Sequence, residues 1–224
     1  MDKLTPSHLA ELIDHTLLKP ATTAKDIHKL CEEAKKYQFH SVCVSPCFVS
    51  LAHGLLKQSP VVVTTVIGFP MGYNTAYVKK MEARNAIARG ALELDSVLNT
   101  GLLKEGKNQY IKNEIEGILN LSSKIVFKFI IETSLLTDCE KKRAAQLLIE
   151  TGADFVKTST GFFGSGTSLE DVRFLKNEVQ NKIKIKAAGG IKDFKTVHEM
   201  VQAGADRVGS SNSVKIYREC LENN

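Results

Sequence analysis

The sequence of 224 residues contains no tryptophan, five prolines and five cysteines, and aromatic residues make up only 7% of it. The cysteines are odd in number and widely scattered, apart from Cys43 and Cys47. A disulfide-stabilised exported domain is therefore not indicated, and reduced thiols in a cytoplasm are expected. Because no second cysteine pair lies at ligand spacing, the sequence also predicts no zinc site.

Long hydrophobic runs are absent as well. The most apolar run, residues 61–69, is far too short to span a bilayer. Residues 1–16 carry charges at both ends and have no uninterrupted apolar core, so they are neither a secretory signal nor a membrane anchor. We therefore expect a cytoplasmic protein without membrane association.

Charge of one sign is not concentrated in any segment. The chain has 30 basic and 25 acidic residues, a formal net charge of +5, and its basic residues are spread over the whole length. Without a basic tail, nucleic acid is not an expected partner, whereas an anionic small molecule would suit the excess positive charge.

Short β-rich runs alternate with longer helical patterns throughout the chain. The helical patterns open on Thr, Ser or Asp and often close on Gly, at residues 23–37, 75–90, 137–152, 168–179 and 193–204. The β-rich runs are residues 12–18, 41–46, 61–68, 93–99, 125–132, 155–160, 182–189 and 206–211. Eight such units in about 200 residues favour a closed barrel over an open doubly wound sheet. The sequence thus predicts a single-domain α/β protein over residues 1–224, a (β/α)8 TIM barrel with a short N-terminal helix.

An internal similarity predicts which strand residues share a level inside the barrel. Residues 90–97, 152–159 and 204–211 each place Gly before a strand, and counting five residues on gives Asp95, Lys157 and Gly209. The same count from Gln38 gives Cys43 on the second strand. Interior layers of such barrels are filled from alternate strands, so we expect these four residues to form one layer near the catalytic end. The alternative is that Gly-Ala-Asp is merely a common junction between helix and strand.

Lys157 is a charged amine within a run that otherwise indicates a buried strand. A lone strand lysine is usually snorkelling or ion-paired. Here, however, Lys186 is expected near the end of the next strand, where barrel enzymes keep their active sites. Two neighbouring ammonium groups repel each other and lower the pKa of at least one, which makes a nucleophilic amine that can form a Schiff base. Lys182 and Lys184 share a strand face with Lys186 but are expected towards the opposite end of the barrel.

Two aspartates are candidates for holding the amines or shuttling protons beside them. Asp95 lies within the fourth strand, and Asp14 is expected at the end of the first. The two roles cannot be separated by sequence, because a carboxylate that holds a lysine also tunes its pKa. His15 is expected to face the other way as a structural residue, and Glu132 ranks below the aspartates.

Glycine-rich loops after strands 6, 7 and 8 predict a phosphate site, since backbone N–H groups and helix N-termini there can approach an anion. Cys43 is expected to line the pocket as a small buried side chain rather than act as a nucleophile. The predicted substrate- and phosphate-binding residues are Cys43, Thr158, Thr160, Gly161, Gly189, Gly190, Lys192, Gly209, Ser210 and Ser211.

Taken together, these motifs resemble the deoxyribose-phosphate aldolase family along nearly the whole chain. The most specific are FVKTSTG at residues 155–161 and KAAGG at residues 186–190, with LIDHTLLKP, VCVSP, VIGFPMGYNT, ELDSVLNTG, IIETSLLT and RVGSS as further matches. The resemblance implies a class I aldolase that needs no metal or cofactor and reversibly cleaves 2-deoxy-D-ribose 5-phosphate to acetaldehyde and D-glyceraldehyde 3-phosphate. It further implies that Lys157 is the Schiff-base nucleophile, that Lys186 depresses its pKa, and that Asp95, supported by Asp14, transfers protons.

The chain departs from the family pattern in a few places. Members often have Asn in place of Ser45, a hydrophobic residue in place of Ser96 and a small residue in place of Lys184. Some relatives use a Tyr in a C-terminal tail for proton transfer, and Tyr217 is not at that position. Relatives are often dimers, which makes a homodimer an expectation that no residue pattern tests.

Two alternatives remain open from the sequence. One is another Schiff-base aldolase for phosphosugars, transaldolase-like, which would share the lysine but need a pocket for a larger ketose. The other is a barrel that binds phosphosugars or nucleic acid without catalysis, which gives no reason for a lysine inside strand 6.

Overall fold

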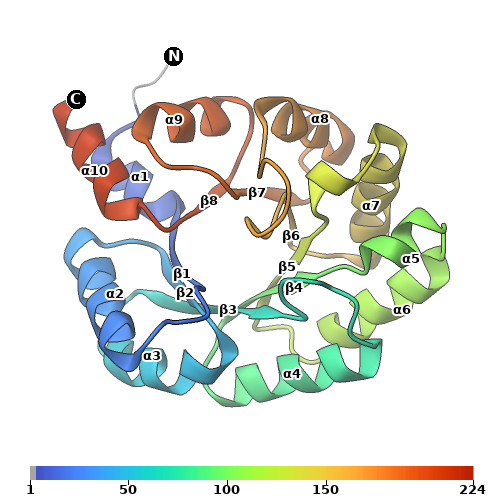
Figure 1. Cartoon of the computed structure of the whole chain (residues 1–224), viewed down its shortest axis with the longest axis horizontal. Coiled ribbons are helices and arrows are strands. Elements are labelled where there is room, and N and C mark those ends of the chain that lie inside the picture. Colours follow the sequence, from blue (N-terminus) through green and yellow to red (C-terminus); the bar gives the residue numbers. More distant parts are fainter. Residues whose placement is uncertain (1–3, 224) are drawn as a thin grey trace.

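Eight parallel strands pair in sequence order, and β8 pairs with β1 to close the barrel. This is a computed structural model, and it describes residues 4–223. The strands form the central ring in Figure 1: β1 Ile13–Leu17, β2 Ser41–Val44, β3 Val62–Ile67, β4 Glu93–Val97, β5 Val126–Ile130, β6 Phe155–Lys157, β7 Lys184–Ala188 and β8 Arg207–Ser210. The predicted (β/α)8 barrel is confirmed.

Helices surround the ring of strands (Figure 1). They are α1 Pro6–Leu12, α2 Ala24–Tyr37, α3 Val49–Leu56, α4 Ala76–Ala88, α5 Thr100–Lys104, α6 Asn108–Leu119, α7 Asp138–Thr151, α8 Leu169–Val179, α9 Phe194–Gln202 and α10 Ser213–Glu222, with 3₁₀ turns at Pro46–Phe48 and Thr133–Leu135. Helix α1 confirms the short N-terminal helix. Helices α3, α5, α6 and α10 lie outside the five patterns on which the sequence reasoning relied.

Local sequence explains where the helices begin and end. Thr23 and Thr137 cap α2 and α7 with reciprocal hydrogen bonds to the third residue of each helix, which satisfies backbone donors that have no partner inside the helix. Gly152 ends α7 in the left-handed conformation, and Gln38 ends α2 in the same conformation. Gln38 therefore takes the place of such a helix-ending glycine. For this reason, counting five residues on from Gln38 leads to the matching strand position, Cys43.

The strand register confirms the predicted interior layer. Crossing two strand pairings and then advancing two residues along the chain leads from Cys43 to Asp95. Repeating this move leads to Lys157, then to Gly209, and finally back to Cys43, so the four residues lie at one level. The same register gives two further layers of four below it, as in other barrels of this type. The middle layer is Asp14, Thr64, Lys128 and Lys186, and the lower one is Ser41, Glu93, Phe155 and Arg207.

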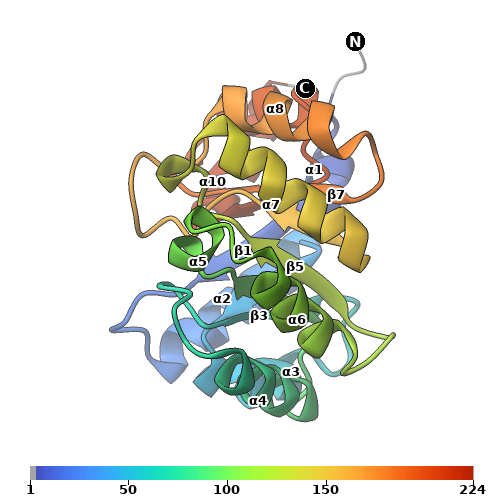
Figure 2. The ribbon, with the colours of Figure 1, turned by 90° about the vertical axis from the view of Figure 1, so that its right-hand side faces the viewer.

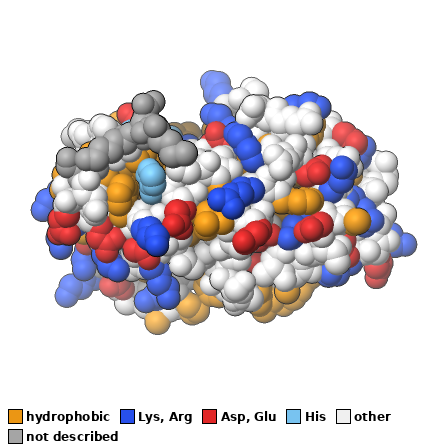
Figure 3. Space-filling view, turned by 90° about the horizontal axis from the view of Figure 1, so that it is seen from above, with side chains coloured by type: hydrophobic (Ala, Val, Ile, Leu, Met, Phe, Trp, Pro, Cys, Tyr) orange, Lys and Arg blue, Asp and Glu red, His pale blue; other side chains and the backbone are white. Residues whose placement is uncertain are grey.

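Apolar packing lies between the barrel and its helices, whereas the barrel interior is largely polar. The outward strand residues Val42, Leu94, Phe129 and Ile185 are fully buried against the helices. Figure 2 shows this helical layer from the side, and Figure 1 shows α1 beside α10. On the face seen in Figure 3, basic and acidic side chains are interspersed. Within residues 4–223, no helix is long and apolar enough to cross a membrane.

Candidate active site

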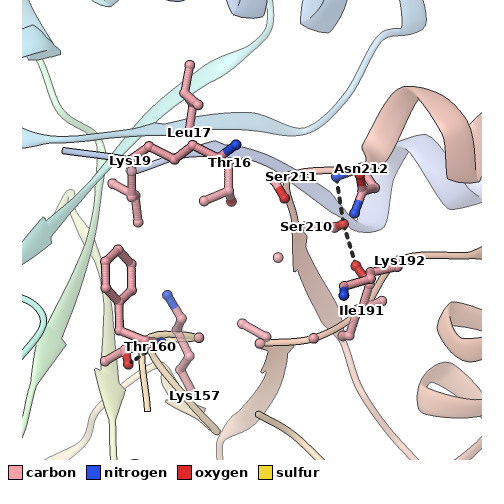
Figure 4. Close-up of a pocket in the computed structure, with 17 residues that line it drawn as sticks. Thr16, Leu17, Lys19, Lys157, Thr160, Ile191, Lys192, Ser210, Ser211 and Asn212 are labelled. Atoms are coloured by element: carbon pink, nitrogen blue, oxygen red, sulfur yellow. Dashed lines mark hydrogen bonds between the residues drawn. The ribbon is translucent and has the colours of Figure 1, made fainter. Parts of the chain in front are cut away.

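A cavity of about 290 Å³ opens among the loops that follow β1, β6, β7 and β8 (Figure 4). These loops lie at the carboxyl ends of the strands, where barrel enzymes place their active sites. Nine of the predicted residues line it: Lys157, Thr160, Gly161, Gly189, Gly190, Lys192, Gly209, Ser210 and Ser211. Sequence reasoning missed eight others: Thr16, Leu17, Leu18, Lys19, Phe162, Ala188, Ile191 and Asn212.

Cys43 and Thr158 are not among the residues that line this cavity, and their contact with substrate stays a prediction. The Thr158 hydroxyl donates to the carbonyl of Ala188 and accepts from its N–H, both at 3.1 Å, so it joins β6 to β7. Cys43 is fully buried in the layer beneath the cavity, and that burial raises the pKa of its thiol to about 11. A protonated, enclosed thiol supports the structural interpretation of Cys43.

One carboxylate oxygen joins the two predicted lysines. Asp95 Oδ2 accepts hydrogen bonds of 2.7 Å from both Lys157 Nζ and Lys186 Nζ. Lys186 also forms an ion pair with Asp14. Only Lys157 of these four residues reaches the cavity, and Figure 4 shows its amine directed into the open space. Lys186 and both aspartates therefore lie behind the reactive amine.

The two lysines have opposite pKa shifts. Burial lowers the pKa of Lys157, Asp95 opposes this effect, and the charge of Lys186 lowers the pKa further. Burial also acts to lower the pKa of Lys186, but Asp14 and Asp95 outweigh it and raise the pKa well above its ordinary value. Lys186 thus stays charged while Lys157 is the amine inclined to lose its proton, which is the division of roles that Schiff-base chemistry requires.

A larger charged cluster surrounds these residues, and sequence reasoning missed half of it. Lys128 Nζ lies 3.0 Å from Asp95 and 2.5 Å from Glu93, and Arg207 lies 3.2 Å from Glu93 and 2.8 Å from Asp14. Lys128 stands between two phenylalanines in β5, and this is the same signal that identified Lys157. His40 adds a 2.9 Å hydrogen bond to Glu93 from the edge of the cluster.

The composition of this cluster singles out Lys157. Lys128, Lys186 and Arg207 each ion-pair with two carboxylates, whereas among the described residues Lys157 reaches only Asp95. The side chains of Lys128, Lys157, Lys186 and Arg207 outnumber the carboxylates of Asp14, Glu93 and Asp95 by one. Loss of the Lys157 proton balances the cluster, and unbalanced charge is costly in a buried site. The neutral amine is therefore the form that the barrel interior favours.

Three further residues from the sequence reasoning have identifiable places. Asp14 is the second residue of β1 rather than at its end, and its side chain lies in the middle interior layer. His15 faces outward as expected, where Nε2 lies 2.9 Å from Glu33. Glu132 is buried, and its Oε2 accepts hydrogen bonds from the backbone N–H of Thr160, at 3.0 Å, and from its hydroxyl. It thereby fixes the loop after β6.

The loops after β6 and β7 touch through glycine. Thr167 N donates to the carbonyl of Gly189 at 3.1 Å, and Gly166 and Gly189 both have positive φ angles. A Cβ atom on Gly166 would lie 2.6 Å from the Gly189 oxygen, closer than such contacts allow. The backbone approach that forms this side of the cavity therefore requires glycine.

The departures from the family pattern lie away from the cavity wall. Lys184 begins β7 at the opposite end of the barrel, with its amine 5.6 Å from the centre of the Phe155 ring. Ser96 is buried, and nothing in the structure explains its hydroxyl. Tyr217 packs on Tyr37 with ring centres 5.2 Å apart. No cluster of three His, Cys, Asp or Glu side chains that could hold a metal ion occurs in residues 4–223.

Comparison with known proteins agrees with this geometry. The profile described as "DeoC/LacD family aldolase" matches residues 9–218. A deoxyribose-phosphate aldolase of Thermoanaerobacter pseudethanolicus is 49% identical over 215 residues, which cover 95% of this chain and 96% of that relative. One of Halalkalibacterium halodurans is 50% identical over 210 residues, covering 93% and 94%.

A solved structure supports the same relationship. The tetrameric deoxyribose phosphate aldolase of Aeropyrum pernix superposes with a TM-score of 0.92 at 33% identity, covering 98% of this chain and 94% of that one. The closed barrel, the buried lysine at the carboxyl end of β6 and these likenesses along nearly the entire sequence point the same way. This chain belongs to the DeoC/LacD family of aldolases.

Proposed function

We propose that the protein reversibly cleaves 2-deoxy-D-ribose 5-phosphate to acetaldehyde and D-glyceraldehyde 3-phosphate, as a step in the breakdown of deoxyribose phosphate. The observation that carries this proposal is the Lys157 amine, which has a lowered pKa and opens into a cavity bordered by glycine-rich loops. The names of the relatives support the choice of substrate. We assign this activity to one domain that comprises residues 1–224.

The reaction begins when neutral Lys157 Nζ attacks the aldehyde carbon of the open-chain sugar. Loss of water gives an iminium that withdraws electrons from the neighbouring carbon. The C2–C3 bond then breaks, its electron pair forms an enamine, and the C3 hydroxyl proton leaves as C3 becomes the aldehyde of glyceraldehyde 3-phosphate. Protonation of the enamine at C2 and hydrolysis of the iminium release acetaldehyde and restore Lys157.

Asp95 is the carboxylate closest to these proton transfers. Burial acts to raise its pKa, but Lys128, Lys157 and Lys186 together hold it well below the ordinary range, so Asp95 stays ionised at neutral pH. It is therefore available to accept the C3 hydroxyl proton through water and, being a weak base, to release it to the enamine. Asp14 keeps Lys186 in place and charged.

The cavity suits a phosphate at its far end. Its lining includes Lys19, Lys157 and Lys192 but no Asp or Glu side chain. Gly189, Gly190 and Gly209 leave backbone open to an anion, and α10 begins directly after the lining residues Ser211 and Asn212. Charge and backbone geometry both favour a phosphomonoester bound between the loops after β7 and β8, with Thr160, Gly161 and Ser210 at its edge.

Borohydride trapping tests the proposal. Acetaldehyde or deoxyribose phosphate with borohydride should attach a reduced adduct to Lys157, which peptide mass mapping locates. Lys157→Met should abolish trapping, and Lys182→Met, an exposed lysine outside the site, should not. An adduct on another lysine, or none, would contradict the assignment. Acetaldehyde release from several sugar phosphates distinguishes this activity from that of a transaldolase-like enzyme.

We further propose a homodimer in the cytoplasm with no nucleic-acid partner. Cys31, Cys43, Cys47 and Cys139 are free thiols, which suits a reducing compartment. Exposed apolar residues on and beside α4, Tyr73, Tyr77 and Met81, support self-association. Sedimentation equilibrium of the purified protein would report the assembly, and a monomer at all concentrations would contradict it.

A further inference from the structure

A turn fixes the backbone of Lys19 at the rim of the cavity, although the sequence reasoning gave this residue no role. It follows β1, and its carbonyl accepts hydrogen bonds from Thr22 N at 3.0 Å and Thr22 Oγ1 at 2.7 Å. Pro20 comes next, and proline is favoured at this position of a tight turn because its φ is already fixed. Figure 4 shows the Lys19 side chain at the cavity rim beside Thr16.

The charge of Lys19 has no counter-ion of its own. Within the described part of the chain, no carboxylate lies at ion-pair distance from its amine. Lys29, in the adjoining cavity on the other side of the same loop, behaves differently, since it lies 3.8 Å from Glu33. Asp26 in that cavity caps α2 by accepting from Thr23. The neighbouring charges are thus occupied, and Lys19 remains available to a ligand.

Lys192 is the matching group on another loop. It lines the cavity after β7, and no carboxylate pairs with its amine within residues 4–223. A phosphomonoester carries a charge of about −1.5 to −2 at neutral pH. Because Lys157 is bonded to the aldehyde carbon of the substrate as an iminium, Lys19 and Lys192 are the two other lining cations that can pair with a phosphate.

We propose that Lys19 is a specificity-determining residue, which selects the phosphorylated substrate by pairing with its phosphate opposite Lys192. This inference rests on the proposed function and deepens it. The glycine-rich loops supply backbone donors that orient the phosphate, and Lys19 supplies charge that an unphosphorylated sugar cannot use. Its contribution is therefore confined to substrates that carry the anion.

Steady-state kinetics with two sugars tests this assignment. Lys19→Met should raise KM for 2-deoxyribose 5-phosphate at least tenfold with kcat changed less than twofold, and leave kcat/KM for 2-deoxyribose within twofold. Lys19→Arg should restore KM to within about threefold of wild type. Lys29→Met is the matched control and should change neither substrate's constants. Inorganic phosphate, as a competitive inhibitor, should bind at least tenfold more weakly to Lys19→Met.

The inference is overturned if Lys19→Met, with a wild-type circular dichroism spectrum and melting temperature, leaves KM for the phosphorylated sugar unchanged. It is also overturned if both sugars suffer equally, because that would make Lys19 part of the general architecture. If wild type cleaves neither sugar, the proposed function fails instead. Calorimetric binding of inorganic phosphate to wild type and Lys19→Met then decides the role of Lys19 independently.

Discussion

Lys157 Nζ lies 2.7 Å from Asp95 Oδ2, and this oxygen also accepts from Lys186 at the same distance. A carboxylate that belonged to Lys157 alone would stabilise its ammonium form. Here Asp95 also pairs with Lys128 and Lys186, and their positive charges offset much of the stabilisation that Asp95 gives the Lys157 ammonium. The geometry therefore fixes the amine in position while leaving its pKa low, and positioning and activation are separate effects of one contact.

Replacement of Lys186 should move the pH dependence of the reaction. Lys186→Met removes the positive charge that lowers the pKa of Lys157, and it frees Asp95 to stabilise the Lys157 ammonium. The acid limb of the kcat/KM profile should therefore shift upward by at least about one pH unit, with a loss of about tenfold or more at neutral pH. Lys184→Met, on the same strand but exposed, should keep the wild-type profile. An unmoved limb in Lys186→Met would contradict the electrostatic coupling.

Replacement of Lys128 should lower the free energy of unfolding. Lys128→Met leaves Glu93 and Asp95 with one fewer buried counter-ion each, which should lower the free energy of unfolding by about 3–5 kcal/mol. Adding Glu93→Gln should recover at least about 1 kcal/mol, because one uncompensated acid disappears. Urea denaturation measures both effects. Lys215→Met, which breaks a surface pair with Glu219, should cost less than about 1 kcal/mol. Equal effects of the two lysine substitutions would rule out a structural role for the cluster.

Sequence periodicity was sufficient for the barrel, because hydrophobic runs and helix caps are local properties. It was also sufficient for the layer of Cys43, Asp95, Lys157 and Gly209, since helix-ending residues set the count to each strand. It did not identify Arg207, whose partner Asp14 is 193 residues away in the chain. Lys128 carries the same local signal as Lys157, a lysine inside an apolar strand, but was not identified either. Sequence periodicity also missed Lys19, whose position depends on a loop rather than on a strand.

The same limit applies at Thr158, whose contact with substrate, like that of Cys43, stays a prediction. Strand alternation tells which side a residue faces, but it does not tell which groups on a neighbouring strand the side chain meets. Thr158 comes directly after Lys157, yet its hydroxyl is engaged by the backbone of Ala188 in the neighbouring strand. Such bonding between strands follows only from the assembled register.

Acid should destabilise the protein through its interior carboxylates. Burial acts to raise the pKa of Glu93, but Lys128, His40 and Arg207 outweigh it and lower the pKa from 4.5 to about 2. A depressed folded-state pKa adds stability that is complete above pH 4.5 and disappears as the pH falls through 2. Glu93 should thus account for about 2 kcal/mol of the stability lost between about pH 6 and pH 3. Urea melts of Glu93→Gln should lose correspondingly less over that interval, and an identical slope in the variant would contradict this origin.

The backbone contact between Gly166 and Gly189 should control substrate affinity without controlling the fold. Gly166→Ala puts a methyl group against the Gly189 carbonyl at a position with φ of +79°, so the loop after β6 must move away from the anion-binding loop. KM for 2-deoxyribose 5-phosphate should rise by about tenfold or more, while the far-ultraviolet circular dichroism spectrum stays native. Gly117→Ala is the matched control, because nothing lies within 4 Å of its added carbon in α6. That substitution should stabilise the protein by about 0.5–1 kcal/mol and leave KM unchanged. Wild-type KM in Gly166→Ala would mean that the two loops do not bind substrate as a unit.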